Sequence, residues 1–196
     1  MLLLESTHNA FLDLDIALLK VINGANNPVL DQIAWYLSTT WIWIPLFIYI
    51  AWQLLTTYGK KMGVIAICFV GLAVGINDIV SSRFFKPTTE RLRPSHTPEL
   101  EAQLHYVFEP NGNEYRGGTY GFYSAHAGNF AALTLFIIFA LPRHKKLLSI
   151  LSVVLLSASL SRIYLAVHFP SDVAFGWFMG GLLGYLFYKL FQFVKH

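Results

Sequence analysis

Five apolar segments, each near the length that crosses a lipid bilayer, recur along this chain of 196 residues. About 20 residues of helix span the hydrocarbon core of a membrane. Hydrophobic residues make up 55% of the chain and charged residues 13%, whereas soluble domains carry about 25% charged residues. We therefore predict an all-α, polytopic membrane helical bundle of about five spans. The predicted spans are residues 41–57, 62–80, 124–141, 147–167 and 173–193.

Residues 1–28 differ from these spans because acidic residues interrupt their apolar pattern. Asp13 and Asp15 stand among leucines and isoleucines. Such a pattern is typical of an amphipathic helix that lies at the membrane surface or re-enters the membrane. Together with Glu5, these aspartates also argue against a cleaved signal peptide. We predict an N-terminal amphipathic or re-entrant helix.

The link between the second and third spans, residues 81–123, is much longer than the other links. It is rich in Pro, Gly, Arg, Glu and Tyr. Long loops in compact domains are usually lids or binding loops. We interpret residues 1–196 as one membrane-embedded domain in which residues 81–123 form an active-site loop.

The sequence disfavours several other kinds of site. The net charge is only +3, and the basic residues are not interleaved with aromatic ones in a stripe, so we expect no nucleic-acid binding. The single cysteine, Cys68, excludes a disulfide framework and a Cys/His metal site. Gly176, Gly180 and Gly184 recur every four residues, which predicts close helix packing and not a phosphate loop. Nothing indicates an obligatory protein partner.

Three polar clusters interrupt the apolar pattern, each where a span begins or ends on the same side. The first follows the second span and contains Lys86 and Arg93. Lysine supplies a point charge and arginine a fork of donors, and this combination suits a phosphoryl group. Basic residues at a span end also anchor lipid headgroups, so this cluster alone does not identify a site.

The second cluster, residues 123–126, begins the third span and contains Ser124, Ala125 and His126. The amino end of a helix offers free backbone amides and the positive end of the helix dipole, which can hold an anion. The structural alternative is that Ser124 only caps the helix and that His126 bonds to a neighbouring carbonyl.

The third cluster, residues 161–172, joins the last two spans. Pro170 fits the first turn of a helix, which places His168 just before that turn and Asp172 within it. A carboxylate that reaches one imidazole nitrogen leaves the other nitrogen basic and nucleophilic. Arg162 adds a further cation. A His–Asp pair by itself is as often structural.

Together the clusters resemble the signature of the type 2 phosphatidic acid phosphatase (PAP2) superfamily, K-x6-R-P, then P-S-G-H, then S-R-x5-H-x3-D. The first pattern is matched by Lys86, Arg93 and Pro94. The third is matched by Ser161, Arg162, His168 and Asp172. In the second, Tyr123 replaces proline and Ala125 replaces glycine, whereas Ser124 and His126 are kept. Alanine retains the backbone amide and adds only a methyl group.

The resemblance implies a two-step phosphoryl transfer without a metal or other cofactor. His168 attacks phosphorus to give a phosphohistidine, Asp172 orients and charges the imidazole, and His126 protonates the leaving oxygen and later activates water. The phosphate oxygens are then held by Lys86, Arg93, Arg162, Ser124 and the Ala125 amide. Phosphoryl transfer requires mainly positioning and charge stabilisation, which agrees with this set. It also requires a neutral His168 beside a protonated His126.

The implied function is that of a bacterial membrane lipid phosphatase similar to undecaprenyl-diphosphatases. We expect a membrane lipid as substrate, with undecaprenyl diphosphate favoured over phosphatidylglycerophosphate, phosphatidate and lipid A phosphates. A second class is a non-catalytic protein that binds or transports a lipid headgroup. The His168/Asp172 pair disfavours it, because binding needs no nucleophile. A third class is the vanadate-dependent haloperoxidases, which have a similar signature, but the apolar spans of this chain disfavour that function.

The basic residues also predict an orientation. If the three clusters face one side, the other side carries seven basic residues and no Asp or Glu. They are Lys60, Lys61, Arg143, Lys145, Lys146, Lys189 and Lys195. The cluster side holds the other seven, but five of them lie in or beside the predicted site. Short basic links face the cytoplasm by the positive-inside tendency. We therefore expect a multi-pass protein of the bacterial inner membrane with a periplasmic active site.

Overall fold

The computed structural model describes residues 2–109 and 111–195, and within these residues the regular elements are all helical. The predicted all-α bundle is therefore confirmed, and the only β-type pairing in this part of the chain is two isolated bridges in the long loop. The α-helices are α1 (Leu2–Gly24), α2 (Pro28–Ser38), α3 (Ile44–Ile79), α4 (Lys86–Thr89), α5 (Pro98–Glu101), α6 (Ala125–Ala140), α7 (Lys145–Tyr164) and α8 (Pro170–Lys195).

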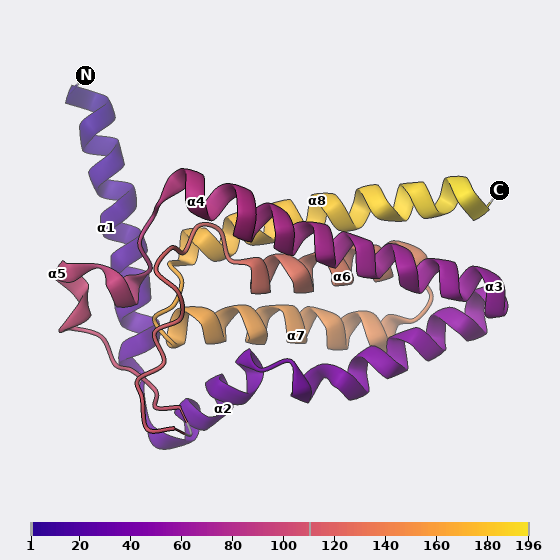
Figure 1. Cartoon of the computed structure of the whole chain (residues 1–196), viewed down its shortest axis with the longest axis horizontal. Helices are drawn as coiled ribbons and strands as arrows, with labels where there is room; N and C mark the ends of the chain where they lie inside the picture. The colour runs from indigo at the N-terminus through magenta and orange to yellow at the C-terminus, as the bar shows by residue number, and fades with distance from the viewer. Residues whose placement is uncertain (1, 110, 196) are drawn as a thin grey trace.

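Helix α3 contains two passes, because its chain reverses at Gly59. This residue has φ of 75° and ψ of 169° inside an otherwise helical run, a conformation that glycine adopts without steric cost. The two arms of α3 meet at this turn and diverge from it, as Figure 1 shows. The reversal falls within the basic link that was predicted between the spans 41–57 and 62–80.

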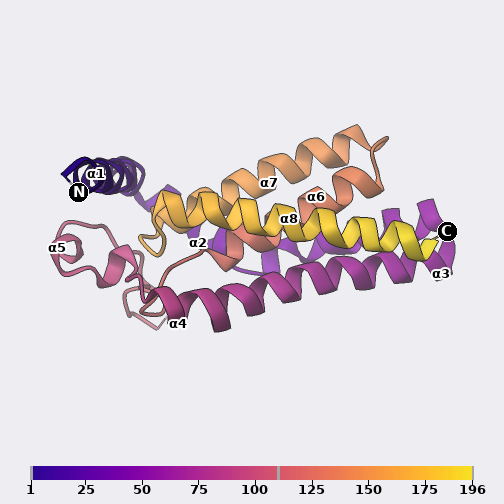
Figure 2. The ribbon, with the colours of Figure 1, turned by 90° about the horizontal axis from the view of Figure 1, so that it is seen from above.

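The two arms of α3, α6, α7 and α8 run along the long axis of the molecule, as two perpendicular views show (Figures 1 and 2). Within the described residues, three helical segments are long and apolar enough to cross a membrane: Trp41–Thr89, Lys145–Tyr164 and Pro170–Lys195. α6 is a shorter apolar helix that packs against α3, α7 and α8. Most of its side chains are buried, so α6 is the central helix of the bundle.

Helix α1 lies across one end of the bundle and not along it (Figures 1 and 2). The predicted N-terminal helix is confirmed over Leu2–Gly24, while its position at the membrane interface stays a prediction. The sequence analysis missed α2. The side chain of Asn27 accepts hydrogen bonds from the amides of Val29 and Leu30, and Pro28 occupies the first turn. The short polar segment of residues 24–28 therefore ends α1 and begins α2.

The long loop is shorter than the predicted 81–123, because helix continues to Thr89. A π-helical turn over Val80–Phe85 passes directly into α4. The hydroxyl groups of Thr88 and Thr89 bond back to the carbonyls of Phe84 and Phe85. The loop therefore starts at Glu90, and Lys86 is on a helix.

The glycines of α8 allow its backbone to touch α6, as predicted. A Cβ atom on Gly180 would collide with the Gly128 carbonyl oxygen, and one on Gly184 would collide with the Ala132 carbonyl oxygen. Small residues at such spacing permit close approach of helices in membranes. This contact fixes the first turns of α6 and α8 relative to each other.

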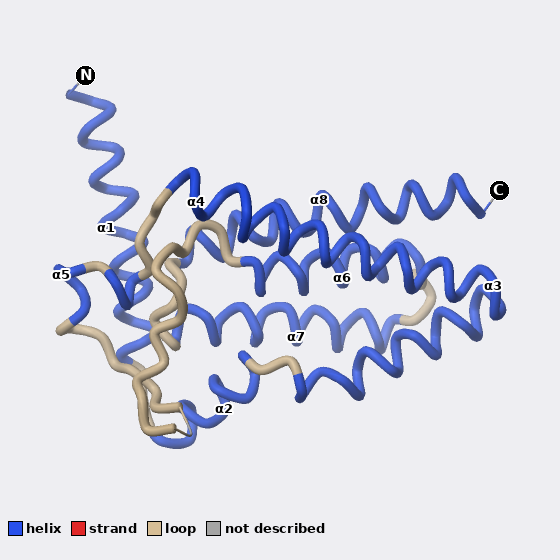
Figure 3. Tube along the Cα trace, viewed as in Figure 1, coloured by secondary structure: helices blue, strands red, loops and turns tan. Residues whose placement is uncertain are grey.

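The long loop lies at one end of the bundle, beside α1, and the α6–α7 link, the Gly59 turn and the C-terminal end lie at the other (Figures 1 and 3). The seven basic residues of the links and of the C-terminal part of α8 are thus at the end opposite the three motifs. The predicted separation of the two groups is confirmed.

We predict that Gly180→Ala destabilises the protein by about 1–3 kcal/mol, as overpacking of a close contact does. The neighbouring Gly181→Ala is the matched control, because its Cβ atom would lie 3.7 Å from the Leu135 side chain, an ordinary contact. Thermal unfolding of both variants in the same detergent measures the difference. Equal midpoints for Gly180→Ala and Gly181→Ala would contradict the close packing of α6 and α8.

Candidate active site

The third motif lies in the tight connection between α7 and α8. Pro170 begins α8, and Ala166 adopts a left-handed conformation with φ of 55°. The amides of Val167 and His168 both donate to the Arg162 carbonyl. This turn holds His168 between the two helices with 2% of its surface exposed.

Asp172 faces His168 from the first turn of α8. Its Oδ2 atom lies 3.6 Å from Nδ1 of the imidazole, an ion-pair separation that is longer than a hydrogen bond. Oδ2 accepts a hydrogen bond of 2.9 Å from the Phe169 amide, and Oδ1 accepts one of 2.6 Å from Arg91. The predicted approach of Asp172 to one ring nitrogen is present, but the direct hydrogen bond is not formed.

Three basic side chains surround His168. Its pKa lies well below the usual 6.5 because the ring is buried and because Arg93, Arg162 and Lys86 carry positive charge nearby. The imidazole is therefore neutral at neutral pH, and a neutral ring keeps one nitrogen lone pair free. The structure brings the basic residues of the first and third motifs together around the predicted nucleophile.

Arg93 is fixed by the loop around it. Its amide donates to the Thr119 carbonyl at 3.0 Å, and its Nε atom donates to the Tyr120 carbonyl at 3.2 Å. Gly117, with φ of 67°, packs against the guanidinium, where a larger residue would collide with it. Burial and the charge of Arg162 lower the pKa of Arg93 to about 10. The group stays protonated at neutral pH, and the repulsion favours a bound anion.

Arg162 is held by two residues that the sequence analysis did not single out. Its Nη1 atom donates to the Ser38 hydroxyl at the end of α2, and Nη2 donates to the Tyr115 hydroxyl at 3.0 Å. Burial alone would raise the pKa of Tyr115, but the charge of Arg162 and this hydrogen bond lower it below the usual 10.0. No pattern in the sequence connects these three residues, because each comes from a different segment.

Ser124 caps α6, as the structural alternative required. Its hydroxyl accepts a hydrogen bond of 3.4 Å from the Ala127 amide, and its own amide donates to the Asp172 carbonyl at 3.0 Å. Ala125 is the first residue of the helix. A Cβ atom on Gly176 would lie 2.6 Å from the Ser124 carbonyl oxygen. The second and third motifs are thus in direct backbone contact.

Tyr123, which stands where the family signature has proline, is anchored by α3. Its hydroxyl donates to Asn77 Oδ1 at 3.0 Å, and its carbonyl accepts from the Ser81 hydroxyl at 2.7 Å. The side-chain amide of Asn77 donates to the Ala125 carbonyl and to Oδ1 of Asn129. The fully buried Asn77 therefore joins the start of α6 to the second arm of α3. The sequence analysis missed this residue, which looks like any polar residue near a span end.

His126 lies on the first turn of α6 and packs against Phe130, with ring centroids 5.2 Å apart. Arg162 and His168 lie near its ring. The two predicted catalytic histidines are therefore neighbours, although 42 positions separate them in the sequence.

Four of the predicted site residues carry a buried polar atom that has no hydrogen-bond partner among the described residues. Only five such side-chain atoms occur in that part of the chain, and the fifth belongs to Thr134. The four are Nη1 of Arg93, Nε of Arg162, Nε2 of His126 and Nδ1 of His168. An unsatisfied buried group costs about 1–3 kcal/mol, and proteins seldom keep several together. Nδ1 of His168 faces Asp172, and the other three atoms together indicate a site for a polar ligand.

Other charged residues of the long loop pair with one another. Arg116 forms ion pairs with Glu101 and Glu114, and His105 lies 2.9 Å from Asp31 of α2. Among the residues described, no group of three or more His, Cys, Asp and Glu side chains is arranged to hold a metal ion.

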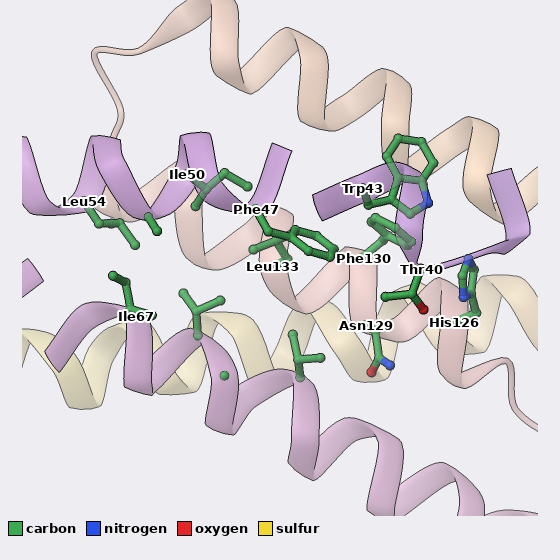
Figure 4. A pocket seen from close by; sticks show the side chains of 14 residues that line it. Thr40, Trp43, Phe47, Ile50, Leu54, Ile67, His126, Asn129, Phe130 and Leu133 are labelled. Atoms are coloured by element: carbon green, nitrogen blue, oxygen red, sulfur yellow. The ribbon is translucent and has the colours of Figure 1, made fainter. Parts of the chain in front are cut away.

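An apolar cavity of about 340 Å³ extends from the site between the two arms of α3 and α6. Figure 4 shows His126 at one end of a row of apolar side chains. Thr40 and Asn129 lie near the same end. The remaining side chains of the lining are Trp43, Phe47, Ile50, Ala51, Leu54, Ile67, Val70, Val74, Phe130 and Leu133.

Comparisons with known proteins agree with this architecture. The sequence matches the family model of the PAP2 superfamily over residues 64–195. It is 35% identical over 184 residues to the lipid A 4′-phosphatase of Porphyromonas gingivalis, covering 94% of this chain and 75% of that protein. It is 34% identical over 177 residues to the lipid A 4′-phosphatase of Bacteroides thetaiotaomicron, covering 90% and 76%. The undecaprenyl-diphosphatase of Sulfolobus acidocaldarius is 25% identical over 175 residues, covering 88% and 76%.

Two solved structures share the fold. One is the PAP2 type phosphatidylglycerolphosphate phosphatase of Bacillus subtilis, with a TM-score of 0.65, 24% identity and coverage of 93% of this chain and 86% of that chain. The other is Aquifex aeolicus LpxE, with a TM-score of 0.62, 25% identity and coverage of 90% and 95%. Because the family match spans more than half of the sequence and the relatives span most of it, this chain belongs to the PAP2 superfamily and is a membrane lipid phosphatase.

Proposed function

We propose that this enzyme removes the 4′-phosphate of lipid A through a phosphohistidine intermediate. The observation that carries the chemistry is the set of three unpaired buried polar atoms, Nη1 of Arg93, Nε of Arg162 and Nε2 of His126. These three side chains, with Lys86, place positive charge or a ring nitrogen near His168. A phosphate ester is a ligand that satisfies such a set of donors.

In the first step, the free nitrogen of His168 attacks phosphorus, and the bond from phosphorus to the sugar oxygen breaks. Nδ1 of His168 faces Asp172, so Nε2 is the attacking atom. Lys86, Arg93 and Arg162 stabilise the charge that spreads over the phosphoryl oxygens. His126 gives a proton to the departing oxygen; the bound phosphate is an anion that offsets the nearby cations and so favours the protonated imidazole.

In the second step, water attacks the phosphohistidine, and the bond between nitrogen and phosphorus breaks. His126, now neutral, accepts a proton from this water. The products are inorganic phosphate and the regenerated imidazole of His168. Ser124 and the Ala125 amide, at the amino end of α6, hold a phosphoryl oxygen throughout, because a helix amino end favours an anion.

The choice of lipid A rests on the relatives and on the apolar cavity. Two relatives named lipid A 4′-phosphatase are 34–35% identical to this chain, whereas the undecaprenyl-diphosphatase is 25% identical. The cavity beside His126 is lined almost entirely by apolar side chains. We propose that it holds one acyl chain of the lipid whose phosphate reaches His168. Undecaprenyl diphosphate is the second candidate, which the more distant relative supports.

The orientation proposed for the enzyme places its site at the periplasmic face of the inner membrane. Seven basic residues and no acidic ones lie at the opposite end of the bundle, and short basic links favour the cytoplasm. A periplasmic site meets lipids of the outer leaflet, which suits both lipid A and a lipid carrier diphosphate.

We predict that the purified enzyme in detergent releases phosphate from lipid A faster than from undecaprenyl diphosphate, phosphatidate or phosphatidylglycerophosphate.

The His168→Ala variant should lose activity roughly ten-thousand-fold, because the nucleophile has no substitute. His144→Ala is the matched control, since His144 lies at the opposite end and makes no side-chain cap bond. Activity should survive EDTA and fall with orthovanadate. Near-normal turnover by His168→Ala would exclude the phosphohistidine.

The acidic limb of kcat/KM is predicted to lie below pH 6.5. This parameter reports the free enzyme, in which burial and neighbouring cations lower the pKa of His168 below 6.5. Activity falls only as the pH drops through that lowered value, because a protonated imidazole cannot attack. Lys86→Met removes one of the cations and should move this limb toward higher pH, even though it also slows turnover. A limb at or above pH 6.5 that ignores Lys86→Met would contradict the assignment.

Labelling of single cysteines tests the orientation. In a Cys68→Ser background, Glu99→Cys lies on the loop at the motif end and Arg143→Cys lies in the α6–α7 link, and both positions are exposed. A membrane-impermeant maleimide applied to intact cells should label position 99 and leave position 143 unlabelled until the membrane is permeabilised. The reverse pattern would place the site in the cytoplasm and remove the argument for an outer-leaflet substrate.

A further inference from the structure

Arg91 connects the carboxylate behind the nucleophile to the N-terminal helix. Its Nη1 atom donates to Asp172 Oδ1 at 2.6 Å, and its Nη2 atom donates to Asp15 Oδ2 at 2.7 Å. Its guanidinium also lies over the Phe169 ring, 4.5 Å from the centroid. One arginine thus bridges two carboxylates that come from α8 and α1.

Asp15 is itself fixed by the start of α8. Its Oδ1 atom accepts a hydrogen bond of 2.8 Å from the Ser171 amide, and its Oδ2 atom accepts one of 2.5 Å from the Ser171 hydroxyl. Only 4% of Asp15 is exposed. A buried carboxylate is costly unless it is paired and hydrogen-bonded. Asp15 of α1 is therefore a buried carboxylate at the site end of the bundle, and it is hydrogen-bonded to the first turn of α8.

These contacts determine the orientation of Asp172. Arg91 holds Oδ1, and the Phe169 amide holds Oδ2 in the direction of His168. The carboxylate has no exposed surface, so protein groups alone set its rotation. The Arg91 side chain is 26% exposed, and a long arginine side chain has considerable rotamer freedom. Nη1 of Arg91 also donates to the Ser171 hydroxyl at 2.7 Å, and that hydroxyl donates to Asp15. Asp15 and Ser171 together therefore restrict the rotamers of Arg91 and keep it on Asp172.

We propose that Asp15 and Arg91 are positioning residues for the phosphatase reaction. Asp15 holds Arg91, Arg91 holds Asp172, and Asp172 keeps the imidazole of His168 in the orientation for attack. This proposal rests on the proposed phosphohistidine mechanism. It also makes α1, which lies outside the residues 64–195 that match the family, a part of the catalytic unit.

The alternative is that the ion pairs only attach α1 to the bundle. If the ion pairs only attach α1, their removal changes the stability of the protein and leaves turnover per folded molecule unchanged. A positioning role changes kcat and leaves KM nearly unchanged, since the phosphate is held by Lys86, Arg93 and Arg162 and not by Arg91. The two roles are therefore separable by kinetics on the folded fraction.

The test compares Asp15→Asn and Arg91→Gln with the wild-type enzyme in detergent, on the lipid phosphate that the wild type hydrolyses fastest. We expect kcat to fall about ten-fold or more in each variant, with KM changed less than about three-fold, because a misoriented carboxylate weakens only the chemical step. Arg91→Lys should recover part of the loss from Arg91→Gln. Asp31→Asn is the matched control, because Asp31 of α2 joins the N-terminal region to the loop through His105 and to α7 through Tyr164, but does not contact Asp172.

A double-mutant cycle determines whether Asp15 acts through Arg91. If it does, Asp15→Asn should cost little further in the Arg91→Gln background, so the two effects on kcat are not additive. Additive effects, or full kcat in folded Asp15→Asn enzyme, would overturn the proposal. Loss of kcat in Asp31→Asn equal to that in Asp15→Asn would overturn it too, since general loosening would then explain both. Absence of wild-type activity on every lipid phosphate would instead disprove the proposed function.

Discussion

The mutual repulsion of three basic side chains around one buried imidazole is the constraint on which the structure of the site depends. Like charges in a poorly solvated place separate unless the scaffold prevents it. Here Lys86 is at the start of α4, Arg93 is in the loop, and Arg162 is near the end of α7. Because each group belongs to a different element, none can move away without distorting the fold. The same arrangement keeps His168 neutral, and in the proposed mechanism it attracts a phosphoryl group, so one electrostatic feature serves both the proposed nucleophile and the proposed binding site.

Helix packing converts this constraint into a fixed geometry. The glycines of α8 bring its backbone against α6, and the amide of Ser124 donates to the carbonyl of Asp172. The amino ends of two helices therefore begin side by side, and both dipoles point their positive ends toward the same region. Asn77 adds the second arm of α3 to this junction. The distance between the second and third motifs is thus set by backbone contacts, which do not depend on flexible side chains.

The sequence predicted those features that local pattern or motif spacing encodes. Apolar runs identified the spans, and the positions of Lys86, Arg93, His126, His168 and Asp172 relative to span ends predicted that they meet. Arg162 was placed correctly, but its partners Ser38 and Tyr115 were not found, since they lie 124 and 47 positions away. The loop start was placed too early, because polar residues that suggest the end of a span are accommodated in a π-helical turn. The contact between Arg91 and Asp15 likewise depends on how α1 crosses the bundle, which no periodicity specifies.

Residues before position 64 contact residues of the candidate site and line part of the apolar cavity. The family match covers residues 64–195, and all three motifs lie inside it. Yet Arg162 is held by Ser38 of α2, Arg91 is held by Asp15 of α1, and the first arm of α3 forms one wall of the apolar cavity. Two members with identical motifs can therefore differ in the orientation of their basic residues and in the space beside His126. In the proposed mechanism the motifs carry out the reaction, and the contacts of the N-terminal region with Arg162, Arg91 and the cavity shape the site that would select the lipid.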